Sequence, residues 1–175
     1  IVLIPNYMCV EVFENLDDSV EFVYYGLDIN LDPDLGNCKS LVDENVCDIF
    51  FMVHYFGKAC AYKKISSFCR KNDLEIIEDA THCMIPLDGI GKTGKFIIYS
   101  PYKFFPIPDG ALIVSNKLSE EEQELFEDIL SGIDNKFQTK KWIIKELIRY
   151  LTPITLINIL TIKKFKFENT LDYIV

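Results

Sequence analysis

The sequence predicts an α/β protein with a mainly parallel central sheet flanked by helices. Segment 48–56, DIFFMVHYF, is a continuous apolar run of the kind that forms a strand buried on both faces of a parallel sheet. It is followed by KACAYKKISSFCRKN at 58–72, whose apolar residues recur at helical spacing, and by the strand-like LEIIED at 74–79. Strands that alternate with helices in this way pair in parallel, because each helix crosses back over the sheet.

The remaining elements follow the same alternation. Other short β-rich runs predict strands at 1–5, 20–25, 95–100 and 111–116. Four segments are expected to be neighbours in one sheet, with the 58–72 helix on a face: 48–54, 74–78, 95–99 and 111–115. Helical patterns predict helices at 7–16 and 118–133, and the second begins with Ser119 and Glu122 in the spacing of a capping box.

Composition excludes several classes of protein. A chain of 175 residues with 49 % apolar content can bury a core, which argues against disorder. The net charge of −9 argues against nucleic acid as the partner, because phosphate contact needs a basic face. Six scattered cysteines and the lack of an export leader predict free thiols in a reducing cytoplasm. No apolar run reaches the roughly 20 residues that span a bilayer.

Positive charge is concentrated late in the sequence. Residues 135–175 hold eight Lys/Arg and three Asp/Glu, a net charge of +5, which leaves −14 for residues 1–134. Segment 140–167 is both basic and strongly apolar, a composition that suits docking on a partner or on a membrane surface. A helix pair that packs on the rest of the protein or in a dimer contact, with solvated lysines, is the favoured interpretation.

Candidate functional residues lie at the carboxyl ends of strands, where ligands bind in sheets of this kind. The 74–79 strand ends in Glu78 and Asp79 and is followed by His82, and the 48–54 strand ends at His54. His54 is interpreted as a partly buried histidine with satisfied hydrogen bonds, and the same interpretation stays open for His82. For Asp79, a functional role and a cap of the following segment are equally supported.

Lys103 lies three residues after Ser100, in an apolar, proline-containing segment between two strands. A buried ammonium is costly there unless it has a partner or a chemical use. A lysine that forms a Schiff base with the cofactor aldehyde, and an acid such as Asp79 that pairs with the pyridine nitrogen, are what a pyridoxal phosphate site needs. The Ser100 hydroxyl suits the cofactor phosphate, and His82 suits the ring region. Aspartate and lysine at this separation occur in many domains, so the alternative that Lys103 faces solvent or pairs with Asp109 stays open.

The segment that runs from LEIIEDATHCM to GIGKTGKFIIYSPYKFFPIPDGALIVSNK resembles the core of the DegT/DnrJ/StrS-type sugar aminotransferases. In that family a strand ends in Glu-Asp-Ala, and a Gly-x-x-Gly turn precedes a strand that ends in Ser-x-x-Lys. The earlier LIPNYMC, DINLDPDL and MVHYFGKACAYKKISSFCRKNDL resemble family segments in the same order. The resemblance therefore covers residues 1–117.

This resemblance implies a fold, a cofactor and an activity. The fold would be the three-layer fold type I of pyridoxal phosphate-dependent transferases, with 1–117 as a partial large-domain core and 118–175 as a helical extension. The resemblance assigns four residues: Lys103 to catalysis and the Schiff base, Asp79 to the pyridine nitrogen, His82 to the ring region and Ser100 to the phosphate. The implied reaction is transamination of a nucleotide-linked keto-sugar, with glutamate as amino donor, for polysaccharide or amino-sugar biosynthesis. The implied assembly is a cytoplasmic homodimer.

The sequence also departs from the family pattern. The family's Ser-Gly-Thr phosphate-binding segment, and the aromatic residue that stacks on the ring, lie upstream of the strand that opens this sequence. Lys95 replaces the usual acidic residue after the Gly-x-x-Gly turn, and Asp109-Gly110 replaces a Gly-Gly pair. These departures raise an alternative: a catalytically incomplete fragment or pseudoenzyme that serves as a binding or assembly module, membrane-peripheral through 140–167.

Three other motif matches are set aside. Ser100 and Lys103 also fit the Ser-x-x-Lys of β-lactamases, but the Lys-Thr-Gly at 92–94 comes before it, which is the wrong order. The Gly-x-Gly-x-x-Gly at 89–94 echoes a dinucleotide fingerprint, yet a strand follows it where that motif needs a helix. Two separated histidines and unpaired cysteines give no metal-ligand spacing.

Overall fold

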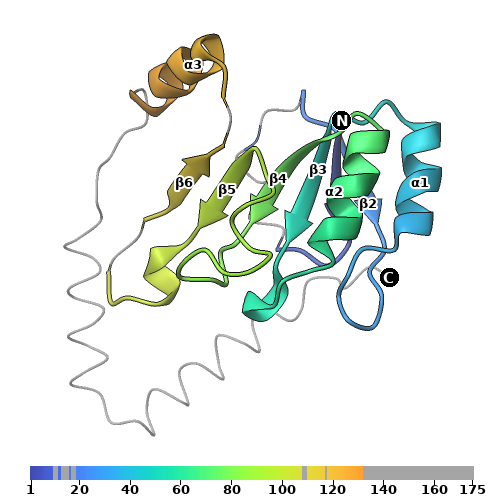
Figure 1. Cartoon of the computed structure of the whole chain (residues 1–175), viewed down its shortest axis with the longest axis horizontal. Coiled ribbons are helices and arrows are strands. Elements are labelled where there is room, and N and C mark those ends of the chain that lie inside the picture. The colour runs from blue at the N-terminus through green and yellow to red at the C-terminus, as the bar shows by residue number, and fades with distance from the viewer. Residues whose placement is uncertain (10–11, 13–15, 17–18, 108–109, 117, 132–175) are drawn as a thin grey trace, which may run out of the picture. The chain divides into compact units, whose positions relative to one another are not determined.

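The computed structural model describes residues 1–9, 12, 16, 19–107, 110–116 and 118–131, which form one six-stranded sheet with helices (Figure 1). The strands are β1 (Val2–Pro5), β2 (Phe22–Tyr25), β3 (Ile49–Val53), β4 (Glu75–Asp79), β5 (Phe96–Tyr99) and β6 (Leu112–Ser115). The helices are α1 (Leu35–Glu44), α2 (Tyr62–Lys71) and α3 (Glu120–Ser131), with single 3₁₀ turns at Tyr55–Gly57 and Pro101–Lys103.

The sheet has the order β2-β1-β3-β4-β5-β6, in which β1 to β5 pair in parallel and β6 pairs antiparallel with β5. The predicted α/β class with a mainly parallel sheet is therefore confirmed. The four segments predicted to be neighbours form the consecutive strands β3 to β6. The chain direction reverses only at β6, so the loop between β5 and β6 starts at the carboxyl edge of the parallel strands.

Two helices differ from the prediction. Residues 7–9, expected to start a helix, form a bend and a position without regular secondary structure, and most of 10–16 lies outside the described residues. Helix α1 was not predicted. It starts where the Asp34 side chain caps it by accepting hydrogen bonds from the N–H groups of Gly36 and Asn37, which would otherwise have no partner.

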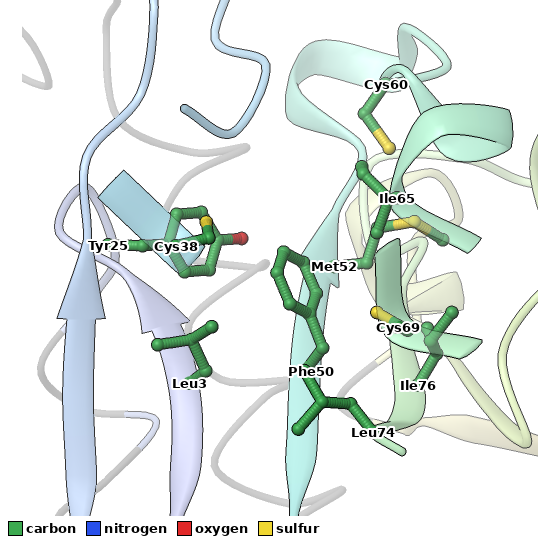
Figure 2. Close-up of a cluster of buried hydrophobic side chains, with 10 residues drawn as sticks. All are labelled: Leu3, Tyr25, Cys38, Phe50, Met52, Cys60, Ile65, Cys69, Leu74 and Ile76. Carbon is green, nitrogen blue, oxygen red and sulfur yellow. The ribbon is translucent and has the colours of Figure 1, made fainter. Parts of the chain in front are cut away.

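The main core lies between the sheet and helices α1 and α2 (Figure 2). Phe50 of β3 is fully buried and stacks on Tyr25 of β2, with ring centroids 5.0 Å apart. Cys38 of α1 and Ile65 of α2 are fully buried in the same cluster, so both helices cover the same face of the sheet. Each large apolar side chain buried in this way stabilises the fold by roughly 1.5–3 kcal/mol.

Helix α3 is attached to the start of β5. Its predicted capping box is confirmed: Glu122 N–H donates to Ser119 Oγ (3.2 Å), and Ser119 N–H donates to Glu122 Oε2 (2.9 Å). The Glu122 carboxylate also pairs with Lys95 at 2.6 Å, and the Phe126 ring lies 5.4 Å from that of Phe96. Lys95 thus gives this helix an ion pair.

All six cysteines are free thiols, as predicted. Within the described ranges, no helix combines the length and apolar character needed to cross a membrane.

Candidate functional site

The candidate site lies at the carboxyl edge of the sheet, where β4 and β5 end side by side. Asp79, the last residue of β4, is in register with Ile98 of β5. Ser100 follows β5 directly, and the 3₁₀ turn that ends at Lys103 comes next. The parallel pairing thus brings residues 20 or more positions apart in the sequence to one edge.

Asp79 is half-buried and closes a turn, with its Oδ1 accepting a hydrogen bond from the Thr81 N–H at 2.8 Å. No helix follows it before β5, so Asp79 is not a helix cap. Burial, and secondarily the Asp79 charge, raise the pKa of the neighbouring Tyr55 hydroxyl. That hydroxyl donates to the Tyr7 carbonyl at 2.5 Å. Among the described residues, no cation pairs with the Asp79 carboxylate.

Lys103 reaches the segment that follows Asp79. Its Nζ donates to the Thr81 Oγ1 at 3.1 Å, so Lys103 and Asp79 both contact Thr81. The side chain is exposed, and within the described part of the chain its ammonium has no carboxylate partner. Asp109, the alternative partner, lies outside the described residues. The amine is thus held near the edge by a neutral hydroxyl, which a ligand can displace more easily than an ion-pair partner.

Ser100 is buried, and its carbonyl accepts the Lys103 N–H at 3.1 Å, which holds the turn closed. The Ser100 hydroxyl makes no hydrogen bond to any described residue. The residue as a whole is buried, but the hydroxyl oxygen itself is not fully enclosed, so water or a ligand can reach it. This hydroxyl is therefore available to accept or donate at the edge of the sheet.

His82 is oriented by Phe56, a residue that the sequence interpretation missed. The Phe56 N–H donates to His82 Nδ1 at 3.1 Å, and the two rings are nearly parallel, with centroids 5.9 Å apart. A neutral imidazole that accepts at Nδ1 carries its proton on Nε2. Gly57 permits this approach, because a Cβ there would lie 2.8 Å from the His82 carbonyl oxygen. The exposed His82 thus offers a donor at Nε2.

Glu78 and His54 form a fully buried pair beneath the candidate site. His54 Nδ1 accepts the Cys60 N–H (3.2 Å), so Nε2 carries the proton and donates to Glu78 Oε1 at 2.9 Å. The prediction that His54 has satisfied hydrogen bonds is confirmed, and the residue is fully buried rather than partly buried as predicted.

Glu78 also holds the glycine-containing turn that leads into β5. Its Oε1 accepts from the Gly91 N–H, and its Oε2 accepts from the N–H groups of Thr93 (3.0 Å) and Gly94 (2.9 Å). Burial alone raises the pKa of Glu78, but the hydrogen bonds from His54 and from this turn outweigh it and leave the pKa below its ordinary value. The sequence carried one signal for this role, since an acid in an apolar strand needs partners.

A hollow of about 470 Å³ lies elsewhere in the described structure. It is lined by the 91–94 turn, by Glu75 and Lys95 at the starts of β4 and β5, and by Asn116 after β6. These positions belong to the amino edge of the parallel strands. The hollow is therefore separate from the candidate site.

Comparison with known proteins identifies a family. Residues 23–143 match the model of the DegT/DnrJ/EryC1/StrS aminotransferase family. No curated protein matches the chain.

Solved structures with a similar fold include a DegT DnrJ EryC1 StrS aminotransferase from Brucella abortus. Its sequence is 19 % identical and its TM-score is 0.59. The match covers 77 % of this chain and 40 % of the Brucella chain. Helicobacter pylori PseC, an aminotransferase involved in pseudoaminic acid biosynthesis, is 18 % identical with a TM-score of 0.63, over 78 % and 38 % of the two chains. DesI, solved in the presence of its TDP-sugar product, is 17 % identical with a TM-score of 0.56, over 66 % and 31 %. The chain thus spans at most 40 % of the length of these three structures.

Proposed function

The chain belongs to the DegT/DnrJ/EryC1/StrS aminotransferase family, and from this premise we propose that it forms the cofactor-binding part of a sugar aminotransferase. The observation that carries the proposal is the placement of three residues at one sheet edge: Asp79, Ser100 and Lys103. The Lys103 amine and the Asp79 carboxylate each contact Thr81, and the Ser100 hydroxyl has no partner among the described residues.

Pyridoxal 5′-phosphate is the cofactor that family membership implies, and the residues of this edge fit it. When bound, it supplies an electron-poor ring that accepts the electrons released when a Cα–H bond breaks. Lys103 would hold the cofactor covalently and, once freed, move a proton at the substrate Cα. Asp79 would place its negative charge at the pyridine nitrogen. Ser100 would donate to the phosphate and His82 would donate from Nε2 beside the ring.

The substrate that we propose is a nucleotide-linked keto-sugar, with glutamate as the amino donor. The structures of PseC and of DesI with its TDP-sugar product support this class of substrate. We further propose a role in polysaccharide or amino-sugar biosynthesis, and a homodimer as the active assembly. The cytoplasm is the compartment that suits a protein with six free thiols.

A spectroscopic experiment tests the assignment of Lys103. The full-length protein mixed with pyridoxal phosphate should develop a visible absorbance band, and borohydride treatment should fix the cofactor to Lys103. Lys103→Ala should abolish the band, whereas Lys39→Ala, which removes an exposed lysine paired with Asp43, should keep it. An unchanged band in Lys103→Ala would refute the assignment, and no band in the wild-type protein would favour the incomplete binding module.

The role of Asp79 is tested by Asp79→Asn. The variant should still capture the cofactor through Lys103, because the amide fills the same space. Transamination should slow by roughly 10²–10⁴-fold, the range expected for loss of a group that assists proton transfer. A rate within twofold of the wild type would remove Asp79 from the site.

A further inference from the structure

A second site is indicated on the exposed side of α2. A groove of about 340 Å³ lies between this helix and the turn that follows Gly91. Besides Tyr62, three cationic side chains and three aliphatic hydroxyl side chains line it: Lys63, Arg70, Lys92, Ser66, Ser67 and Thr93. We call it the α2 groove. None of its lining residues belongs to the carboxyl-edge site.

The cations of the α2 groove have no internal partners. Within the described ranges, neither Lys63, Arg70 nor Lys92 forms an ion pair, and Lys63 only approaches the Tyr62 ring, at 5.7 Å. Helix α2 itself carries four basic residues and no acid, in a chain whose net charge is −9. Unneutralised positive charge gathered around a hollow attracts anions to it.

The hydroxyls of the α2 groove are also unused. The side chains of Ser66, Ser67 and Thr93 make no hydrogen bond to any residue that the structure describes. Together with the cations they supply six side chains in the α2 groove that can donate hydrogen bonds to an anion. Arginine adds a planar fork of donors that matches the oxygens of a phosphate group.

Both walls of the α2 groove are fixed in place. The Thr93 N–H is held by the buried Glu78 carboxylate, so the turn that carries Lys92 and Thr93 is anchored to the core. On the helix side, Ile65 is fully buried, and the Tyr62 ring lies so close to Gly89 that a Cβ there would be 2.4 Å from it. The backbone that carries the donors therefore needs no rearrangement when a ligand binds, and the entropy lost is that of the exposed side chains.

We propose that the α2 groove binds the diphosphate group of a small molecule. Its volume is near the lower end of the range of small-molecule pockets, about 300–1,000 Å³, which suits a compact and strongly charged group. Three cations balance the charge of a diphosphate, and the three aliphatic hydroxyls are available to donate to its remaining oxygens. This binding does not depend on the transamination proposed above.

Calorimetric titration of the full-length protein with inorganic pyrophosphate at low salt tests the proposal. We expect saturable binding at one equivalent per chain, weakened at least tenfold in the Arg70→Gln/Lys92→Gln double variant. Lys64→Gln is the matched control, because Lys64 is an exposed neighbour on α2 that does not line the groove. A Ser100→Ala/Lys103→Ala variant, which alters the carboxyl edge, should bind pyrophosphate as the wild type does.

Three results would overturn the proposal: no saturable binding at millimolar pyrophosphate, an equal loss in Lys64→Gln, or loss of binding in Ser100→Ala/Lys103→Ala. A parallel titration with a nucleoside diphosphate tests whether the groove recognises the diphosphate alone or a nucleotide that contains it. Equal affinities for pyrophosphate and the nucleoside diphosphate would mean that the diphosphate alone is recognised. Tighter binding of the nucleoside diphosphate, weakened by the same double variant, would mean that the ligand is a nucleotide. Arg70 and Lys92 are exposed, so these variants should fold normally.

Discussion

Replacement of Glu78 by glutamine should destabilise the fold strongly, although the two side chains have nearly the same shape. Glu78 is fully buried, and both of its oxygens accept hydrogen bonds. One oxygen faces His54 and Gly91, and the other faces Thr93 and Gly94. A glutamine must place an NH₂ group against one of these two pairs of donors, because it has only one oxygen.

The magnitude follows from the number of bonds lost. Two charge-assisted hydrogen bonds are removed, each worth about 1.5–3 kcal/mol, and two buried N–H groups then face a donor. Two such losses add to about 3–6 kcal/mol. We therefore expect Glu78→Gln to lower the free energy of unfolding by about 3–6 kcal/mol.

Equilibrium urea unfolding at pH 7, followed by circular dichroism, measures this change. Glu75→Gln is the matched control, since Glu75 lies on the same strand but is exposed and only pairs with Lys95 at 3.7 Å. Its loss should stay below about 1 kcal/mol. A loss of less than 1 kcal/mol in Glu78→Gln, or equal losses in the two variants, would refute the argument that the turn depends on Glu78.

The same carboxylate predicts a pH dependence. Its folded-state pKa is lowered below the ordinary value of 4.5, so the unfolded chain takes up the proton first as the pH falls. The stability from Glu78 is complete above pH 4.5 and is lost as the pH falls from there through the lowered pKa. The unfolding free energy of Glu78→Gln should lack this pH-dependent contribution. Urea unfolding at a series of pH values would then show a shallower fall of the unfolding free energy with decreasing pH in the variant than in the wild type.

Three further substitutions probe the packing and the caps, each measured by urea unfolding. Gly89→Ala should cost about 1–3 kcal/mol, because Gly89 has φ +79° and its Cβ would overlap the Tyr62 ring. Ile65→Ala should cost about 2–5 kcal/mol, because the Ile65 side chain is fully buried against the sheet. Ser119→Ala should cost about 1 kcal/mol by leaving the Glu122 N–H without its cap.

Each of these has a control in the same chain. Gly26→Ala introduces a Cβ whose nearest neighbour is 3.6 Å away, Val46→Ala shortens a side chain that is 83 % exposed, and Ser131→Ala changes a serine in the last turn of α3. All three should lie within about 0.5 kcal/mol of the wild type. A control that costs as much as its test variant would contradict the mechanism given for that pair.

The sequence predicted the sheet well because its central strands are continuous apolar runs. Such a run in β3 can only be accommodated where both faces are covered, which places it inside a parallel sheet. Helix α2 was predicted because Ile65 and Cys69 recur at helical spacing and are buried on one face. Helix α1 was missed because a single buried residue, Cys38, gives little periodicity; its only clear signal was the cap at Asp34.

At the candidate site, the sequence indicated which residues end the strands but not how they are held. Asp79 and Lys103 could be placed at one edge because parallel strands end together. The contacts of Thr81 and Phe56 depend on turn conformations, such as the φ of +55° at Phe56, which no periodicity encodes. Glu78 was recognised as a polar residue at a strand end, and its hold on the 91–94 turn required the tertiary structure.

The place of β1 inside the sheet has a consequence for synthesis of the protein. Val2 is opposite Phe22 on one side and Ile49 on the other, so β1 gains its second neighbour 47 positions later in the chain. At about 5–20 residues per second, translation takes roughly 2–9 s to cover that distance. During this interval the apolar strand β1, which is buried in the native sheet, has not yet paired with β3, so one of its edges is open. Slow translation before β3 should therefore increase aggregation of the nascent chain and its need for chaperones.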